Sequence, residues 1–479
     1  MRIPETAKII FESAEIINIE RKSKELAKFF LNCNMDKNSR VGVLLNRSPI
    51  LIISILALMR MGIPFIGIDH LLPSKRIEYI IEDSNLTHIV TDYRQNFSNG
   101  NKNLNVIYIN NYKELGVDNE DIILNVNNNI IYMIYTSGSS GVPKGISIKK
   151  CSFYTFVNSI SKILNFLPKQ KMLCITSVNF DIFLLESIIP LLLGMTIVLG
   201  GQNEISNPKK IHQLIVKNAI DIIQITPSRI RLLLEFNSEF FSNTTISKIL
   251  IGGEPLSLSV LQNIKRTTNA EIYNLYGPSE TTIWSTVSNL TNQEDVNIGL
   301  PIDGTRIYIL GEEFKPVKNG DIGEICIAGS GLAEGYINNN KLTKEVFCDN
   351  SDYIKERFYR TGDLGKFENG NLIYCGRKDN QIKLRGYRIE LEEIEFNINN
   401  ISGIVNSVAI VKNDLLFVLY CGTTSEHTIR SNLKQLLPHY MIPNFIIKIE
   451  NIPLTYNGKI DRKKTLNFLE EICNGKNKQ

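Results

Sequence analysis

Short apolar runs alternate with helical segments along most of the first 290 residues, and few folds accommodate this alternation. Five of the runs are typical of buried strands and lie at 41–45, 64–68, 88–91, 106–109 and 130–135. The apolar segment 48–61 predicts a helix between the first two, and strand–helix–strand units of this length predict parallel strands. The N-terminal part is therefore expected to be an α/β structure, with helices on the faces of a mostly parallel sheet.

The alternation continues to residue 290 and predicts a second α/β layer. Strands are expected at 172–176, 196–199, 222–225, 248–251 and 271–275, with helices at 152–165, 181–193, 208–217, 228–235 and 257–265. An apolar helical period also predicts helix within 7–33. Residues 297–375 change to strand-like runs with glycine turns, and the charged pair Lys378 and Asp379 marks the expected boundary to a smaller C-terminal unit.

A segment rich in glycine and hydroxyl groups, YTSGSSGVPKG (135–145), follows the predicted strand 130–135. Ligands of open α/β sheets bind beyond the carboxyl ends of the strands, so the segment is well placed for a nucleotide. Glycines at 138, 141 and 145 remove Cβ atoms that would keep backbone N–H groups away from a phosphate, and Lys144 adds positive charge. It is not a Walker A loop, because its lysine is followed by glycine. Taken alone, the segment is also compatible with a flexible surface turn.

Composition excludes several classes of protein. Lys and Arg number 53 against 49 Asp and Glu, a net charge of +4 that argues against nucleic acid as the main partner. The eight cysteines include no C-x-x-C pair and are typical of reduced thiols in a cytoplasmic protein. The start of the chain is acidic where a signal peptide is apolar, and the longest apolar run, 49–59, is shorter than the roughly 20 residues that a membrane span needs. We expect a cytoplasmic protein without a membrane span.

Seven motifs occur in the order seen in adenylate-forming enzymes. They are YTSGSSGVPKG (135–145), NFDIFLLE (179–186), NLYGPSETT (274–282), GEICIAGSGLAEGY (323–336), YRTGDL (359–364), GRKDNQIKLRGYRIELEEIE (376–395) and YNGKIDRK (456–463). Their variants most resemble the adenylation domains of nonribosomal peptide synthetases, and the resemblance covers nearly the whole chain. It implies a large N-terminal domain, 1–377, of two α/β subdomains plus a distorted β-barrel. A small mobile α+β domain, 378–479, is implied to follow it.

The resemblance implies a reaction in two steps. A carboxylate attacks the α-phosphate of ATP to give an acyl-adenylate and pyrophosphate, and the phosphopantetheine thiol of a carrier protein then takes the acyl group. The first step brings negative charges together, so the site needs Mg²⁺ and cations. Lys459 matches the lysine that bridges the substrate carboxylate and the α-phosphate, Glu280 matches the Mg²⁺ carboxylate, and Asp379 matches the hinge of the mobile domain. The implied catalytic residues are Lys459, Thr136 and Glu280.

Further motif positions are implied to bind ATP. Hydroxyl groups and Lys144 of the 135–145 segment would wrap the β- and γ-phosphates. Asp363 would accept hydrogen bonds from the ribose, with Arg377 close by, while Asn274 and Tyr276 would contact adenine. The full implied set is Thr136, Ser137, Gly138, Ser139, Ser140, Gly141, Lys144, Gly253, Glu254, Asn274, Tyr276, Gly277, Asp363 and Arg377.

Asp181 indicates which acid is activated. In members that activate amino acids, an aspartate at this position pairs with the substrate α-ammonium group. It could also be the N-cap of the following helix, and that is compatible with both roles. The other implied pocket positions resemble a glycine signature and are Ile182, Leu185, Gln224, Leu250, Gly252, Leu275, Ile283 and Trp284. The Trp284 indole and its aliphatic neighbours leave little room beyond the α-carbon. Alanine and serine are the nearest competitors, because a cavity separates a methyl group from hydrogen by only about 1 to 3 kcal/mol.

Two departures and two alternative functions accompany this interpretation. Ser279 replaces a usual threonine and Glu334 a usual arginine, both beside the implied ligands. No G-G-x-S carrier motif follows the last motif, so we expect a separate carrier protein or a domain cut from a larger synthetase; an activating accessory protein is left open. An acyl- or aryl-CoA ligase would share the ATP motifs, but Asp181 argues against it. A non-catalytic scaffold is disfavoured by the presence of Lys459, Glu280 and Asp363.

Overall fold

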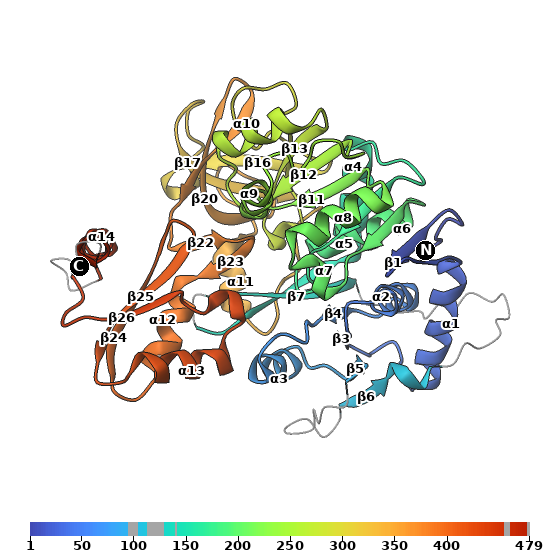
Figure 1. The fold of residues 1–479 in the computed structure, drawn as a ribbon, viewed down its shortest axis with the longest axis horizontal. Helices are drawn as coiled ribbons and strands as arrows, with labels where there is room; N and C mark the ends of the chain where they lie inside the picture. Colours follow the sequence, from blue (N-terminus) through green and yellow to red (C-terminus); the bar gives the residue numbers. More distant parts are fainter. Residues whose placement is uncertain (94–103, 113–128, 139–140, 455–459, 477–479) are drawn as a thin grey trace. The chain divides into compact units, whose positions relative to one another are not determined.

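The computed structural model describes residues 1–93, 104–112, 129–138, 141–454 and 460–476, and it describes side chains up to residue 471. The chain forms two compact units. The first consists of Met1–His70, Ile80–Tyr135 and Gly145–Asp379, and the second of Leu71–Tyr79, Thr136–Lys144 and Asn380–Gln479. Figure 1 shows the elements of both units, coloured along the sequence.

The largest sheet of the first unit has nine strands in the order β15-β14-β13-β12-β11-β9-β10-β1-β2. Its central strands are parallel, while β2, β14 and β15 run antiparallel to their neighbours. The strand bounds are β1 Lys8–Phe11, β2 Ala14–Ile16, β9 Lys171–Cys174, β10 Thr196–Leu199, β11 Ile222–Ile225, β12 Lys248–Gly252, β13 Glu271–Tyr276, β14 Thr286–Asn289 and β15 Leu300–Pro301.

Side chains alternate between the two faces of this sheet and pack into different cores. Ile223, Ile249 and Ile272 share a core with helices α8 (Pro208–Asn218), α9 (Pro227–Phe236) and α10 (Leu258–Thr267), which cover that face in Figure 1. Leu250 and Leu275 belong to the core on the opposite face. The period of two in a strand therefore assigns each face its own set of residues.

The second sheet of the first unit has seven strands in the order β18-β8-β7-β4-β3-β5-β6. Its strands are β3 Val41–Leu44, β4 Phe65–Gly67, β5 His88–Thr91, β6 Asn105–Tyr108, β7 Ile130–Thr136, β8 Lys144–Lys149 and β18 Gly335–Tyr336. One core joins this sheet to the inner face of the nine-stranded sheet. The helices of the first unit include α1 Ile19–Asn32, α2 Pro49–Met61, α4 Lys150–Ile163, α5 Ile182–Glu186, α6 Ile188–Leu192 and α7 Gln202–Ile205. Helix α3, Ser74–Asp83, is divided between the two units.

The third sheet of the first unit is antiparallel. Its strands are β16 Thr305–Leu310, β17 Gly323–Gly329, β19 Phe347–Cys348, β20 Phe358–Glu368 and β21 Asn371–Arg377, with the short helix α11 Asn340–Val346 alongside. Among short 3₁₀ helices, η2 (Ser279–Thr281) matters most for the site; the others are η1 Ile109–Asn111, η3 Glu312–Phe314 and η4 His439–Met441.

The second unit has its own small core, which includes Ile394, Val418 and Ile429. Its elements are β22 Gln381–Leu384, β23 Tyr387–Glu390, α12 Leu391–Asn399, β24 Ile404–Lys412, β25 Leu415–Gly422, α13 Glu426–Leu436, β26 Phe445–Lys448 and α14 Arg462–Lys476. The expected α/β class is confirmed. No helix among the described residues is long and apolar enough to cross a membrane.

Two predicted helices are wrong in part. Residues 7–33 begin with the hairpin β1–β2, because Ile9 pairs with β10 and Glu12 and Ser13 turn the chain with positive φ; only α1 is helical. The helix expected at 181–193 is broken at Ser187, whose φ and ψ are −123° and −69°. Pro190 has no N–H to donate to the carbonyl of Glu186, so a continuous helix would lack that hydrogen bond.

Candidate active site

Three neighbouring strands of the nine-stranded sheet build the floor of the predicted amino-acid pocket. Gln224 on β11 lies opposite Leu250 on β12, and Gly252 on β12 lies opposite Leu275 on β13. The strand alternation puts these four residues on the face away from α8, α9 and α10. They come from three separate sequence segments, and the sheet register brings them together.

Trp284 closes this pocket over Gly252. A Cβ atom at position 252 would lie 2.7 Å from the indole Cη2 and 2.8 Å from the carbonyl oxygen of Leu275, so only glycine leaves room for the ring. The indole is 2% exposed. Thr282 and Ile283, just before it, have φ of 65° and 68°, a conformation that β-branched residues rarely adopt. The strained backbone aims Trp284 at the pocket, and strain of this kind is concentrated at functional sites.

Asp181 lies directly before α5 and is 7% exposed. Its side chain makes no regular N-cap hydrogen bond with α5. The carboxylate accepts a hydrogen bond from Ser279, while its Oδ2 has no partner among the described residues. Burial raises the pKa of Asp181 to about 6, against the opposing effect of Ser279. A buried carboxylate with an unpaired oxygen is suited to bind a cation.

The remaining predicted pocket residues complete the same region. Leu185, Ile283 and Trp284 belong to the core cluster that also contains Leu250 and Leu275, and Ile182 packs against that cluster. All nine predicted substrate residues therefore lie in the first unit. Within the described part of the chain, Gln224 Oε1 and Trp284 Nε1 are buried without a hydrogen-bond partner, as is Asp181 Oδ2.

Three residues near the pocket were missed from the sequence. Glu186 is fully buried and holds α5 against β9 by accepting hydrogen bonds from the Ile175 and Thr176 N–H groups, both at 2.8 Å, and from the Thr176 hydroxyl at 2.6 Å. Glu186 is the last residue of the NFDIFLLE motif, so the motif could have identified it from the sequence. Ser279 bonds to Asp181, and Tyr132 on β7 carries a buried hydroxyl with no partner among the described residues. The positions of Ser279 and Tyr132 beside the pocket depend on segments that are distant in the sequence.

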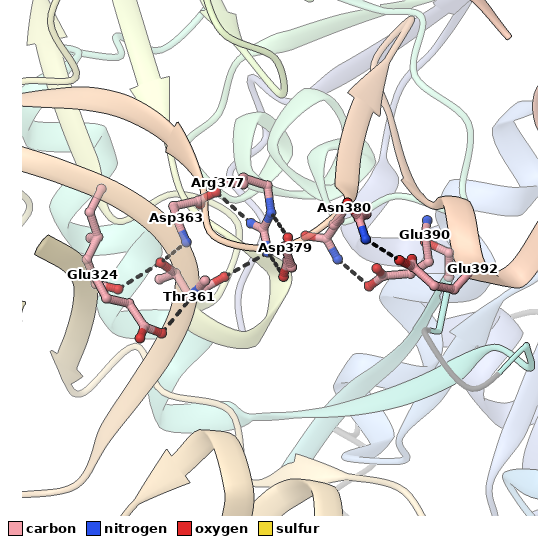
Figure 2. Close-up of polar contacts among 12 residues, drawn as sticks. Glu324, Thr361, Asp363, Arg377, Asp379, Asn380, Glu390 and Glu392 are labelled. Carbon is pink, nitrogen blue, oxygen red and sulfur yellow. Dashed lines mark hydrogen bonds and ion pairs between the residues drawn. The ribbon is translucent and has the colours of Figure 1, made fainter. Parts of the chain in front are cut away.

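The predicted ribose residue, Asp363, is 2% exposed and held on both sides. Its Oδ1 accepts from Arg377 Nη1 at 2.5 Å, and its Oδ2 accepts from the Tyr276 hydroxyl at 2.7 Å. Figure 2 shows Arg377 between Asp363 and Asp379, to which it also donates at 2.7 and 2.8 Å. Burial, and then the Asp363 charge, raise the pKa of Tyr276, so its hydroxyl remains a donor. Asp363 is thus fixed in orientation, and a carboxylate can accept further hydrogen bonds.

The other predicted nucleotide residues of the first unit lie at strand ends. Asn274 Nδ2 donates to the carbonyl of Asn297 at 2.8 Å, which orients its amide. Gly253 has φ +85°, and a Cβ there would be in ordinary contact with Thr226 at 3.5 Å, so its backbone conformation rather than its surroundings favours glycine. Glu254 accepts from the Ser228 N–H at 2.7 Å. Gly277 permits the close return of the chain at Trp284, whose Cα would lie 2.7 Å from a Cβ there.

Glu280, the predicted Mg²⁺ ligand, lies on η2 and is fully buried. Its Oε1 accepts from the Tyr336 hydroxyl at 2.7 Å. Among the described residues, no group of three or more His, Cys, Asp or Glu side chains could hold a metal ion. A single carboxylate fits Mg²⁺ bound together with substrate phosphates, since this ion is usually held by one or two carboxylates rather than by a protein cage.

The predicted phosphate segment belongs to the second unit, with Lys144 at the start of β8. The Ser137 hydroxyl donates to the carbonyl of Arg388 at 2.8 Å, the Gly138 N–H donates to Glu393 at 3.1 Å, and Lys144 lies 3.5 Å from Glu390. Donors suited to phosphate are thus bound to carboxylate and carbonyl oxygens.

Other members of the segment differ in what the structure shows. Gly141 has φ +85°, as a tight turn requires. Thr136 Oγ1 is buried without a partner among the described residues. Ser139, Ser140 and Lys459 lie outside the described residues.

Known proteins resemble this chain in sequence and in fold. Residues 18–337 match the family model described as "AMP-binding enzyme". Gramicidin S synthase 2 of Brevibacillus brevis is 32% identical over 96% of this chain, but the match covers 11% of that protein. The chain spans between 7% and 19% of the length of eight curated relatives that it matches.

Two solved structures share the fold. A four-domain nonribosomal peptide synthetase bound to AMP and glycine is 30% identical, with a TM-score of 0.71 over 95% of this chain and 34% of that one. The o-succinylbenzoate CoA synthetase of Bacillus subtilis has a TM-score of 0.84 at 19% identity, over 96% of each chain. The second likeness shows the fold alone. With the family match over most of its larger unit, the chain belongs to the AMP-binding enzymes, as an AMP-forming ligase of the type found in nonribosomal peptide synthetases.

Proposed function

We propose that this chain activates a small amino acid as its aminoacyl-adenylate, with glycine preferred over alanine and serine. The observation that carries the proposal is the buried Asp181 carboxylate, whose Oδ2 lacks a partner among the described residues, in a pocket closed by Trp284 over Gly252. An α-ammonium group supplies the positive charge and the N–H donors that such a carboxylate needs. A fatty or aryl acid would leave the carboxylate without that partner.

The size of the pocket favours glycine. Gly252 already has no side chain, and the indole occupies the space where its Cβ would be. Leu185, Leu250 and Leu275 are buried in the same pocket, and these aliphatic side chains offer no charge to a polar substituent. The relative with bound AMP and glycine supports this preference by similarity. Gln224 is the residue through which a small hydroxyl, as in serine, would be admitted.

The proposed chemistry is a substitution at phosphorus followed by one at carbon. A carboxylate oxygen of the amino acid forms a bond to the α-phosphorus of ATP, and the bond to the β-phosphate oxygen breaks to release pyrophosphate. A carrier-protein phosphopantetheine thiolate then attacks the acyl carbon and AMP leaves. Mg²⁺ at Glu280 would neutralise phosphate charge, Asp363 would hold the ribose, and Lys459 would act at the α-phosphate.

The domain roles belong to the same proposal. Residues 1–377 would bind ATP and the amino acid, and 378–479 would form a mobile domain that turns about Asp379 and carries Lys459. A separate carrier protein would receive the amino acid in the cytoplasm, and whether an accessory activator takes part is open. An acyl- or aryl-CoA ligase is the alternative function, since the same fold occurs in a CoA synthetase.

Amino-acid-dependent exchange of pyrophosphate into ATP tests this function. With a panel of twenty amino acids, glycine should give the highest rate, followed by alanine and serine. Asp181→Ala should remove the amino-acid-dependent exchange, because it removes the charge that holds the ammonium group. The exposed Asp321→Ala serves as the matched control and should retain activity. A preference for a bulky amino acid would refute the pocket, and full activity of Asp181→Ala would refute the role of Asp181.

A further inference from the structure

Tyr132 has no role in the function proposed so far, although its surroundings tie it to the amino-acid pocket. It lies on β7 opposite Phe65 of β4 and is 2% exposed. Its ring contacts Phe153 edge-on, with the ring centroids 6.2 Å apart. The same core cluster contains Leu275, Ile283 and Trp284, which line the pocket. The aromatic ring alone is therefore enough to explain the packing of this residue.

The hydroxyl group of Tyr132 is not explained by packing. It is buried and has no hydrogen-bond partner among the described residues. A buried polar group without a partner opposes folding, and phenylalanine would fill the same space without that penalty. Tyr132 faces the segment that carries Asp181: Phe65, its partner on β4, shares a face of the sheet with Gly67, where a Cβ would clash with Val178, three residues before Asp181. Burial, and then the charge of Asp181, raise the pKa of Tyr132, in agreement with this placement. The hydroxyl and the unpaired oxygen of Asp181 thus belong to one polar region inside an apolar core.

We propose that the Tyr132 hydroxyl oxygen is a specificity-determining group that accepts a hydrogen bond from the substrate's α-ammonium group beside Asp181. The inference rests on the proposed activation of an amino acid. An ammonium group has three N–H donors, and Asp181 Oδ2 and Gln224 Oε1 are the other buried acceptors without partners in the described part of the pocket. A neutral hydroxyl adds an acceptor without placing a second negative charge beside Asp181. Tyr132 would thereby help to distinguish an amino acid from a hydroxy acid of equal size.

Tyr132→Phe tests the proposal because it removes one oxygen and keeps the ring. The kcat/KM for glycine in pyrophosphate exchange should fall about 10- to 100-fold, as expected for loss of a hydrogen bond to a charged group. The KM for ATP should not change. The inhibition constant of glycolate, which has a hydroxyl in place of the ammonium group, should also stay unchanged when it competes with glycine. The thermal midpoint of unfolding should be equal to or above that of the wild type.

Tyr308→Phe is the matched control, because its hydroxyl bonds to the surface residue Glu356 at 2.9 Å, and it should leave the glycine kcat/KM unchanged. A glycine kcat/KM within twofold of the wild type in Tyr132→Phe would overturn the proposal. Equal losses for glycine, glycolate and ATP, or a lowered thermal midpoint, would also overturn it, since they indicate a structural role. Absence of amino-acid-dependent exchange in the wild type would instead reject the proposed function itself.

Discussion

Burial of the Asp181 carboxylate changes the pH range in which this residue can hold an ammonium ion. Burial raises its pKa to about 6, so the charged form that attracts the substrate predominates only above that pH. The kcat/KM for an amino acid reports ionisations of the free enzyme. It should therefore fall as the pH drops through about 6, by about tenfold per pH unit once the carboxylate is mostly protonated.

Exchange rates measured between pH 5 and 8 check this expectation. In that interval the α-ammonium and carboxylate groups of glycine keep their charges, so the substrate itself does not cause the fall. In Asp181→Asn, the residual amino-acid-dependent rate should show no such step near pH 6. A wild-type profile that stays flat down to pH 5 would contradict a buried, raised-pKa carboxylate at the ammonium site.

Ser279 illustrates what single residues reveal only in the structure. From the sequence it is a departure from the usual threonine, placed beside the implied ligands. In the structure its hydroxyl bonds to Asp181, and serine and threonine both supply that hydroxyl. Tyr132 gives no signal in the sequence, because a tyrosine in an apolar strand is ordinary core. Its unpaired hydroxyl becomes visible only when strands 130–136 and the segments around 181 and 284 are folded together.

At the scale of elements, β12 and the η2–β14 connection make the pocket small. Gly252→Ala adds a methyl group where the Trp284 ring and a backbone carbonyl lie within 3 Å. We expect the glycine KM to rise at least tenfold, because either the indole or the methyl group must enter the substrate space. Pyrophosphate exchange at varied glycine concentrations measures this effect.

A glycine outside the pocket, the N-cap of α7, controls for the substitution itself. Gly201, just after β10, has φ −71°, and a Cβ there would lie 3.4 Å from the nearest atom. Gly201→Ala should therefore leave the glycine KM within about twofold of the wild type, the range usual for a tolerated surface substitution. If Gly252→Ala were as active as Gly201→Ala, the indole would not limit the pocket.

Local sequence patterns predicted several short buried strands of the two parallel sheets with their correct bounds. The strands 196–199, 222–225 and 88–91 have the predicted bounds, since short runs rich in β-branched residues fit buried strands in this context. The hairpin β1–β2 was not predicted, because its apolar residues fit a helical period equally well. The pairing of Ile9 with β10, almost 190 residues away, decided the outcome. The pocket residues were likewise identified from sequence motifs. The motifs do not show that these residues share one face of the sheet, which follows from the strand register.

At the scale of the whole molecule, the proposed reaction divides its two lysines between distant parts of the chain. Lys144, the first residue of β8, belongs to the second unit and lies 3.5 Å from Glu390. In the same segment the Gly138 N–H donates to Glu393, and the Thr136 hydroxyl is buried without a partner among the described residues. Lys459 lies outside the described residues, and its role at the α-phosphate comes from the resemblance. The sequence motifs identify both lysines, but they say nothing of where the Lys459 side chain lies.

Lys144→Ala and Lys459→Ala should therefore impair different quantities. Lys144→Ala should raise the KM for ATP and for pyrophosphate, because it removes one charge from the β- and γ-phosphate contacts. Lys459→Ala should abolish adenylate formation more completely, because it removes the cation at the reacting α-phosphate, where charge stabilisation acts on the transition state. Steady-state exchange and single-turnover formation of the aminoacyl-adenylate separate the two effects. Lys341→Ala, on the surface of α11, is the control and should match the wild type. Identical kinetics in the Lys144 and Lys459 variants would show that the two lysines do not divide the phosphates between them.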